Sequence, residues 1–201
     1  AGKGSRTTFG LFPGTGVGGG CVYDGQILRG KVLSCMEFGH IKLAASEHKG
    51  ATGMTGTLEN EASRLSIASE LTKLAFRGEA PHLQSLVGTE LGAIRSKVIA
   101  ESIAKGDQEV LAVVEQACKA LGYAVANAVL MFCPDCVVLG GGLVEAMPEL
   151  FVGKVSETAK RHVFECYRDE FTVKAALLGD DAATLGAAAW AQKINGAPIS
   201  D

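Results

Sequence analysis

The sequence predicts an α/β lobe in which a mixed β-sheet is flanked by helices. Three features predict it: extended apolar segments come first, a long helical part follows, and strands then alternate with helices toward the C-terminus. No repeat, low-complexity block or proline-rich linker divides the 201 residues. We therefore expect one domain over residues 1–201.

The N-terminal part predicts two strands, at residues 7–12 and 19–24, separated by a glycine-rich run that can reverse the chain as a hairpin. The Asp24-Gly25 turn then leads to extended segments at residues 26–33 and 37–44. Further along, apolar residues recur every three or four positions. This spacing predicts helices at residues 59–76, 90–104 and 107–132.

The remaining part alternates strands with helices. Pro134 ends the long helix, and the apolar run at residues 136–139 predicts a short strand buried on both faces. Residues 140–142 then turn into another helix, and residues 171–177 form the last predicted strand. We predict an alanine-rich last helix at residues 182–192. Asp181 directly before it supports this start, because a negative charge is favourable at the N-terminus of a helix.

The composition argues against several classes of protein. Only 20 % of the residues are charged and the formal net charge is −3, so we expect no binding to nucleic acid or to an anionic membrane. The most apolar stretch, residues 120–133, is too short to cross a bilayer. Neither a signal peptide nor a regular disulfide spacing is present, which indicates a cytoplasmic protein. The chain starts at Ala1, close to its first strand, as a piece of a longer protein would.

Two glycine-rich runs follow predicted strands. In the first, Gly14, Thr15, Gly16 and Gly18 offer backbone N–H groups and one hydroxyl to an anion such as a phosphate. No Gly-Lys-Ser/Thr follows, so this is not a Walker loop, and a glycine-rich hairpin without a ligand also fits. In the second, the residues are Gly140, Gly141 and Gly142, at the start of a helix. Together the two runs suit the two ends of a nucleoside triphosphate.

A carboxylate and an imidazole lie three positions apart at Glu37 and His40, with Gly39 between them. A small polar ligand could approach the backbone there and form hydrogen bonds with both side chains, as a sugar with adjacent hydroxyls would. A surface glutamate and a satisfied structural histidine are the alternative interpretation of the same tetrapeptide.

These residues, together with others in the same order, resemble the ROK family of sugar kinases and repressors, in the actin-like ATPase (ribonuclease H-like) superfold. The resemblance covers nearly the whole chain and rests on GTGVGGG at 14–20, Asp24-Gly25 with Leu28-Arg29-Gly30, EFGH at 37–40, Pro134 followed by VVLGGG, and LGDDAATLGAAA at 178–189. It implies that the first glycine run binds the phosphates of Mg2+-ATP and that the second binds the nucleoside. It also implies that Glu37, His40 and Glu59 bind the sugar, and that the protein is a homodimer.

The sequence departs from the family pattern in two respects. Many members bind a structural zinc through three cysteines, and here these positions hold Gly50, Thr52 and Thr57, so we predict that zinc is absent. The pair Cys133 and Cys136 is a lone C-x-x-C, which we interpret as structural. The N-terminal lobe, with its Asp-x-Gly-x-Thr phosphate loop and catalytic Asp, is also missing from these residues.

We therefore interpret the chain as the C-terminal lobe of a ROK-type sugar kinase, with no catalytic base and no activity alone. Two alternatives stay open: a sugar-sensing repressor of the same family, and a non-catalytic lobe that binds sugar or nucleotide.

Overall fold

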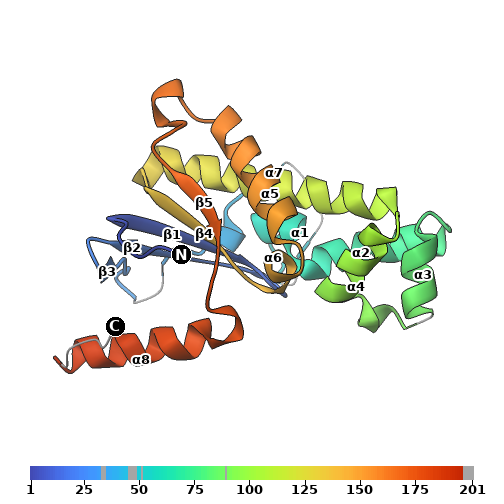
Figure 1. Cartoon of the computed structure of the whole chain (residues 1–201), viewed down its shortest axis with the longest axis horizontal. Helices are drawn as coiled ribbons and strands as arrows, with labels where there is room; N and C mark the ends of the chain where they lie inside the picture. The colour runs from blue at the N-terminus through green and yellow to red at the C-terminus, as the bar shows by residue number, and fades with distance from the viewer. Residues whose placement is uncertain (33–34, 45–48, 51, 89, 197–201) are drawn as a thin grey trace.

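A five-stranded mixed β-sheet forms the centre of the computed structural model, which describes every residue except 33–34, 45–48, 51, 89 and 197–201 (Figure 1). The strand order is β3-β2-β1-β4-β5, with β1 at Thr7–Pro13, β2 at Val17–Tyr23, β3 at Gln26–Ile27, β4 at Cys136–Leu139 and β5 at Thr172–Ala175. The first three strands are antiparallel, and β4 pairs in parallel with β1 and with β5. This mixed α/β architecture confirms the predicted fold class.

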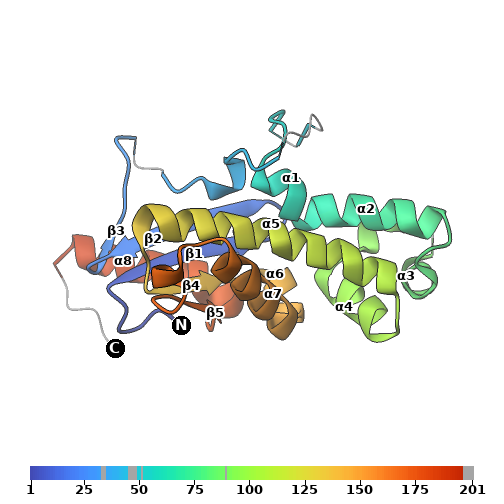
Figure 2. The same ribbon diagram turned by 90° about the horizontal axis from the view of Figure 1, so that it is seen from above.

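The helices gather largely on one side of the sheet and beyond one end of it (Figures 1 and 2). Their bounds are α1 Leu58–Ala62, α2 Arg64–Phe76, α3 Pro81–Val87, α4 Ser96–Ala104, α5 Gln108–Phe132, α6 Gly142–Ala146, α7 Pro148–Arg161 and α8 Ala182–Ile194. The long helix α5 packs against α7, α1 and α2. The helix is capped by Cys133, which has a left-handed φ of 45°. Pro134 follows directly, so the helix ends where this proline predicted.

The core lies between the sheet and α5. Phe9 and Leu11 of β1 are fully buried on this face, whereas Phe12 points to the other face and is 40 % exposed. A short 3-10 helix, η1 (Phe38–His40), joins the core through Phe38, whose ring centroid lies 4.6 Å from that of Phe9. Apolar side chains of β1 alternate between the two faces of the sheet, and η1 packs on the face that carries Phe9 and Leu11.

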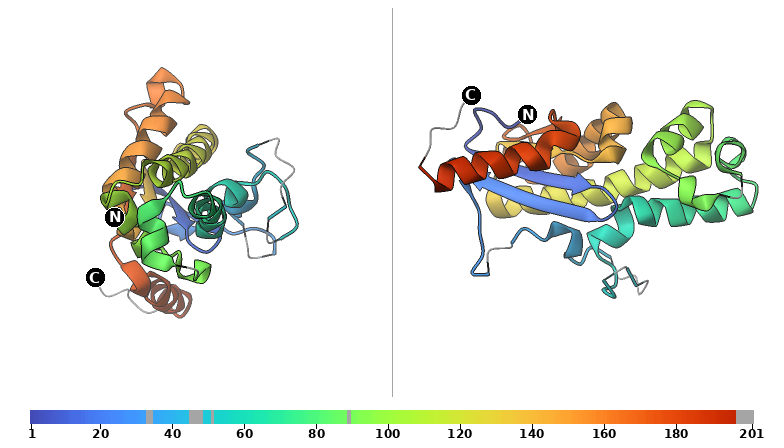
Figure 3. Two further views of the ribbon diagram at one scale, coloured as in Figure 1. Left: turned by 90° about the vertical axis from the view of Figure 1, so that its right-hand side faces the viewer. Right: turned by 90° about the horizontal axis from the view of Figure 1, so that it is seen from below.

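Helix α8 stands apart on the opposite side of the sheet from α5 (Figure 3). None of its residues is buried. Helix α8 contacts the β2–β3 region through Lys193, whose ammonium donates to the carbonyl of Gly25, and through Trp190, whose ring centre lies 5.2 Å from the Arg29 guanidinium. No helix in the described part of the chain has the length and apolar character needed to cross a bilayer.

Several predicted elements differ from the structure. Within residues 26–32 only Gln26–Ile27 is a strand, and the end of this predicted segment at Leu33 lies outside the described residues. Residues 37–44 contain η1 rather than an extended segment. The single helix predicted at residues 59–76 is two helices, because Ser63 is extended (φ −72°, ψ 155°) and caps α2. Helix α4 covers only the second part of residues 90–104, and α3 was not predicted. Asp181 precedes α8, but its side chain makes no capping hydrogen bond.

Candidate functional site

The first glycine bend, defined as Gly14, Thr15 and Gly16, connects β1 to β2. Within it the Gly14 amide donates to the Gly16 carbonyl at 2.8 Å, which closes a tight hairpin. Strand β2 begins at Val17, two residues earlier than predicted. Gly18 therefore lies in the strand, opposite Phe12, rather than in the connecting loop.

The second glycine bend, defined as Gly140, Gly141 and Gly142, lies against the first. Leu139 pairs in parallel with Leu11, so both strands end at the same edge of the sheet. A Cβ on Gly141 would lie 2.6 Å from the Pro13 carbonyl oxygen, and φ is 96° there, so only glycine fits. Two bare segments of backbone, each directly after a strand, therefore meet at one edge of the sheet.

The helix after the second bend is short. Helix α6 has only five residues before Met147 interrupts it, and α7 starts anew at Pro148. Such a short helix has a small dipole, so any ligand at this bend would depend on the close approach of bare backbone rather than on a helix dipole.

The predicted sugar-binding segments contact the backbone of Val17, the residue directly after the first bend. Its amide donates to the Glu59 carboxylate (Oε2) at 2.9 Å. On the other side, a Cβ on Gly39 would overlap the Val17 carbonyl oxygen and lie 3.0 Å from its carbon. Glu59 and the Glu37 to His40 segment are thus both held beside the same strand start.

Local hydrogen bonds fix Glu59 in this position. The Thr57 hydroxyl accepts from the Asn60 amide at 3.3 Å and caps α1, which places Glu59 in the first turn. The Leu58 amide donates to the Ile41 carbonyl at 3.1 Å, which joins the start of α1 to the residue after η1. The two predicted sugar-binding segments are therefore connected through backbone.

His40 carries an unsatisfied polar atom. Its Nδ1 is buried and has no hydrogen-bond partner within the described part of the chain. Glu37, just before η1, is exposed to solvent. A buried imidazole nitrogen without a partner is costly, and the hydroxyl of a polyol could satisfy it.

Arg64 was missed by the sequence analysis. Its amide donates to the Gly14 carbonyl at 2.8 Å, and its guanidinium donates to the Thr15 hydroxyl at 3.1 Å. Arg64 is the first residue of α2, and the break at Ser63 turns it toward the bend. The only signal in the sequence was a serine cap directly before a basic residue.

The positions of the lost zinc cysteines do not fit a metal. A Cβ on Gly50 would overlap the Asn60 side-chain oxygen, Thr52 is exposed, and Thr57 caps α1. Neither glycine nor threonine supplies a thiolate. In the chain outside residues 33–34, 45–48, 51, 89 and 197–201, no group of three or more His, Cys, Asp or Glu side chains could hold a metal ion.

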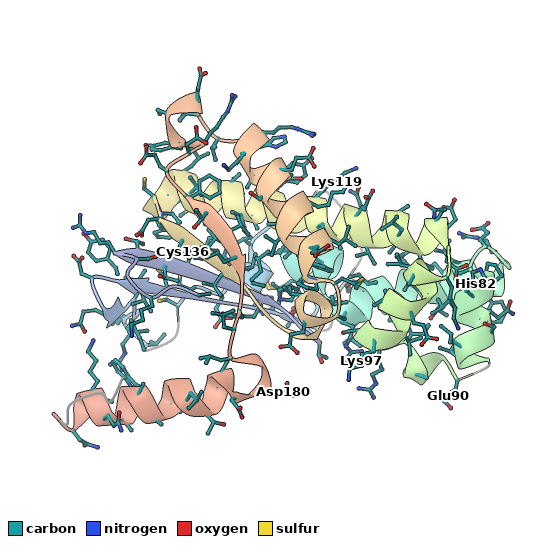
Figure 4. The ribbon with its side chains drawn as sticks, in the orientation of Figure 1. His82, Glu90, Lys97, Lys119, Cys136 and Asp180 are labelled. Atoms are coloured by element: carbon teal, nitrogen blue, oxygen red, sulfur yellow. The ribbon has the colours of Figure 1, made fainter. Side chains whose placement is uncertain are left out.

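The C-x-x-C pair occupies a strand start. Cys133 is exposed at the end of α5, whereas Cys136 is buried in β4 (Figure 4). Between them, the Asp135 carboxylate accepts from the Thr7 amide at 2.6 Å and the Arg6 amide at 2.8 Å. Burial alone would raise the pKa of Asp135, but these amides outweigh it and lower the pKa. The segment thus aligns β4 with β1.

With this geometry in place, comparison with known proteins assigns the family. The model of the ROK family matches residues 1–194. The chain belongs to the ROK family. Its relatives include a glucokinase from Halalkalibacterium halodurans, 32 % identical, with 92 % of this chain and 56 % of the relative covered. A xylose repressor from Caldicellulosiruptor bescii is 26 % identical, with 88 % of this chain and 43 % of the repressor covered.

The solved structures agree with this assignment. A ROK glucokinase from Streptomyces griseus, in complex with glucose and AMPPNP, superimposes with a TM-score of 0.85 at 26 % identity. The match covers 96 % of this chain and 62 % of that glucokinase. The actin-like fold is thereby confirmed, and this ROK chain spans between half and two thirds of the two glucokinases.

Proposed function

We propose that the protein containing this chain transfers the γ-phosphoryl group of ATP to a hydroxyl of a hexose or related sugar. In this proposal the chain is the C-terminal lobe, and the two glycine bends bind the nucleotide while Glu37, His40 and Glu59 bind the sugar. The observation that supports it best is the convergence at Val17, where Glu59 and Gly39 both contact the strand that leaves the first bend. The glucokinase relatives support sugar phosphorylation at the level of the family.

Phosphoryl transfer depends mainly on positioning and on neutralisation of charge. The amides of the bends would hold the phosphates, and the two carboxylates with the imidazole would orient the sugar hydroxyls. The general base would come from the part of the protein outside this chain. Closure of that part over the edge of the sheet would exclude water, which competes with the sugar as an acceptor.

ATP is used as its Mg2+ complex. Mg2+ would be held largely by the nucleotide phosphates, as it commonly is. Mg2+ would neutralise phosphate charge, while this chain would orient the sugar and the nucleotide.

The substitution Glu37→Gln tests the sugar site. It keeps the shape of the side chain and removes its charge, so we expect sugar affinity to fall about tenfold, the loss of one charge-assisted hydrogen bond. Nucleotide affinity should stay unchanged. Calorimetric titration of the full-length protein with each ligand measures both, and Glu165→Gln, at an exposed site after the end of α7, serves as a control. An equal loss of both affinities would contradict the separate roles.

A coupled ADP-release assay of the full-length gene product against a panel of hexoses tests the reaction itself. Turnover of ATP that depends on a sugar is the expected result. The rival function is a sugar-sensing repressor, favoured by the similarity to the xylose repressor. Sugar-dependent DNA binding without turnover would support the repressor, and nucleotide or sugar binding without either would support a non-catalytic lobe.

We also propose a cytoplasmic homodimer that associates through the helices of this lobe.

A further inference from the structure

The first glycine bend offers few hydrogen-bond donors to a phosphate. The Gly14 amide is used by the Gly16 carbonyl, and the Val17 amide is used by Glu59. Of the amides in the first glycine bend, those of Thr15 and Gly16 make no hydrogen bond to another described residue. Two amides and one hydroxyl are a small set for the charge of a triphosphate.

Arg64 adds a positive charge at this point. Its guanidinium has five N–H donors and bonds the Thr15 hydroxyl through one of its terminal nitrogens. It forms no ion pair with an acidic side chain of the described residues, whereas Arg6, Arg77 and Arg161 all do. Among the described residues, its guanidinium is therefore not paired with a carboxylate.

The backbone holds Arg64 where it is. Ser63 caps α2 through the Ser66 amide at 3.2 Å, and the Arg64 amide donates to the Gly14 carbonyl at 2.8 Å. The side chain thus begins beside the bend and needs no rearrangement of the chain to reach a group bound there. A preorganised guanidinium loses less entropy on binding a phosphate than a mobile one.

We infer that Arg64 binds the terminal phosphates of the nucleotide at the first glycine bend. This inference rests on the proposed nucleotide site and adds to it the group that neutralises phosphate charge. A guanidinium fork suits two phosphate oxygens, and Thr15 would orient it. An adenine nucleotide with one phosphate would not depend on Arg64, because in the proposed site the second bend holds the nucleoside end.

Calorimetry on the full-length protein tests the inference with ATP, AMP and inorganic tripolyphosphate. Substitution of Arg64 by glutamine should weaken binding of ATP and tripolyphosphate by at least about tenfold, the loss of a charged hydrogen bond. AMP affinity should stay the same. Arg64→Lys should restore part of the loss, because it keeps the charge without the fork. Arg168→Gln, at an exposed site beyond α7, is the matched control and should change nothing.

The possible results separate the two proposals. If the unsubstituted full-length protein binds ATP and Arg64→Gln binds it equally well, the role of Arg64 is wrong and the nucleotide site stands. The role is also wrong if ATP and AMP weaken together. If the unsubstituted full-length protein binds neither ATP nor tripolyphosphate, the nucleotide site and the role of Arg64 both fail. Should Arg64→Gln melt at a lower temperature, Arg64→Lys gives the comparison in a folded protein.

Discussion

Replacement of Gly39 by alanine should destabilise the protein by about 3 kcal/mol, at the upper end of the usual cost of overpacking. The added methyl group would overlap the Val17 carbonyl oxygen, and that oxygen belongs to backbone fixed in β2. Either η1 or the strand must therefore move. Because η1 inserts Phe38 against Phe9, a shift of η1 would also disturb the core. Urea unfolding followed by far-UV circular dichroism measures the change.

Gly153→Ala is the matched control for this substitution. Gly153 lies in α7, and a Cβ there would meet no atom within 4 Å. Alanine in a helix interior is favoured over glycine by about 0.5–1 kcal/mol, so this variant should be slightly more stable. Equal stability of Gly39→Ala and the unsubstituted protein would show that η1 is not packed on Val17 as described.

Replacement of Asp107 by alanine should cost about 3 kcal/mol, because it leaves buried donors without an acceptor. The Asp107 carboxylate is buried and accepts from the Ser102 hydroxyl at 2.6 Å, the Leu83 amide at 2.7 Å and the His82 amide at 3.2 Å. It therefore fixes the start of α3, whose own preceding residue offers no cap. Asp169→Ala, at an exposed carboxylate that pairs with Lys160, should have little effect.

The stability contributed by Asp107 should depend on pH. Burial raises the pKa of this carboxyl, but the hydrogen bonds from Ser102, Leu83 and His82 outweigh it, and the net pKa is lowered. The contribution is therefore fully present above the unfolded pKa, about 3.9, and is lost as the pH falls through the lower folded pKa. The difference in unfolding free energy between the unsubstituted protein and Asp107→Asn should be constant near neutral pH and shrink below about pH 4. A difference that stays constant down to acid pH would contradict this role.

Local patterns in the sequence predicted the parts of the fold that depend on neighbouring residues. Helix α5 follows from regular apolar spacing that ends at Pro134, and β4 follows from a short apolar run. The two glycine runs were predicted as bends that follow strands, and both bends are present where the sequence placed them. These features were predictable because the residues that cause them lie within the same segment.

Other features depend on residues far apart in the sequence. In the sequence, Ser63 looks like part of a continuous helix. Its role as a cap depends on where α1 ends against α5, and that packing is not visible in the local sequence. Asp107 caps α3 from 24 residues away, and Arg64 reaches a bend 49 residues earlier. Periodicity cannot show such contacts. The start of α3 was the exception, since Pro81 at its first position is a local signal that was available.

Helix α8 has a consequence for the behaviour of this chain in solution. It has 13 residues and buries none of them, so it receives almost no support from tertiary packing. In water, isolated helices shorter than about 12–15 residues are marginal. Its amide protons should therefore exchange with deuterium far sooner than those of α5, and cleavage by a protease should begin in this arm of the molecule.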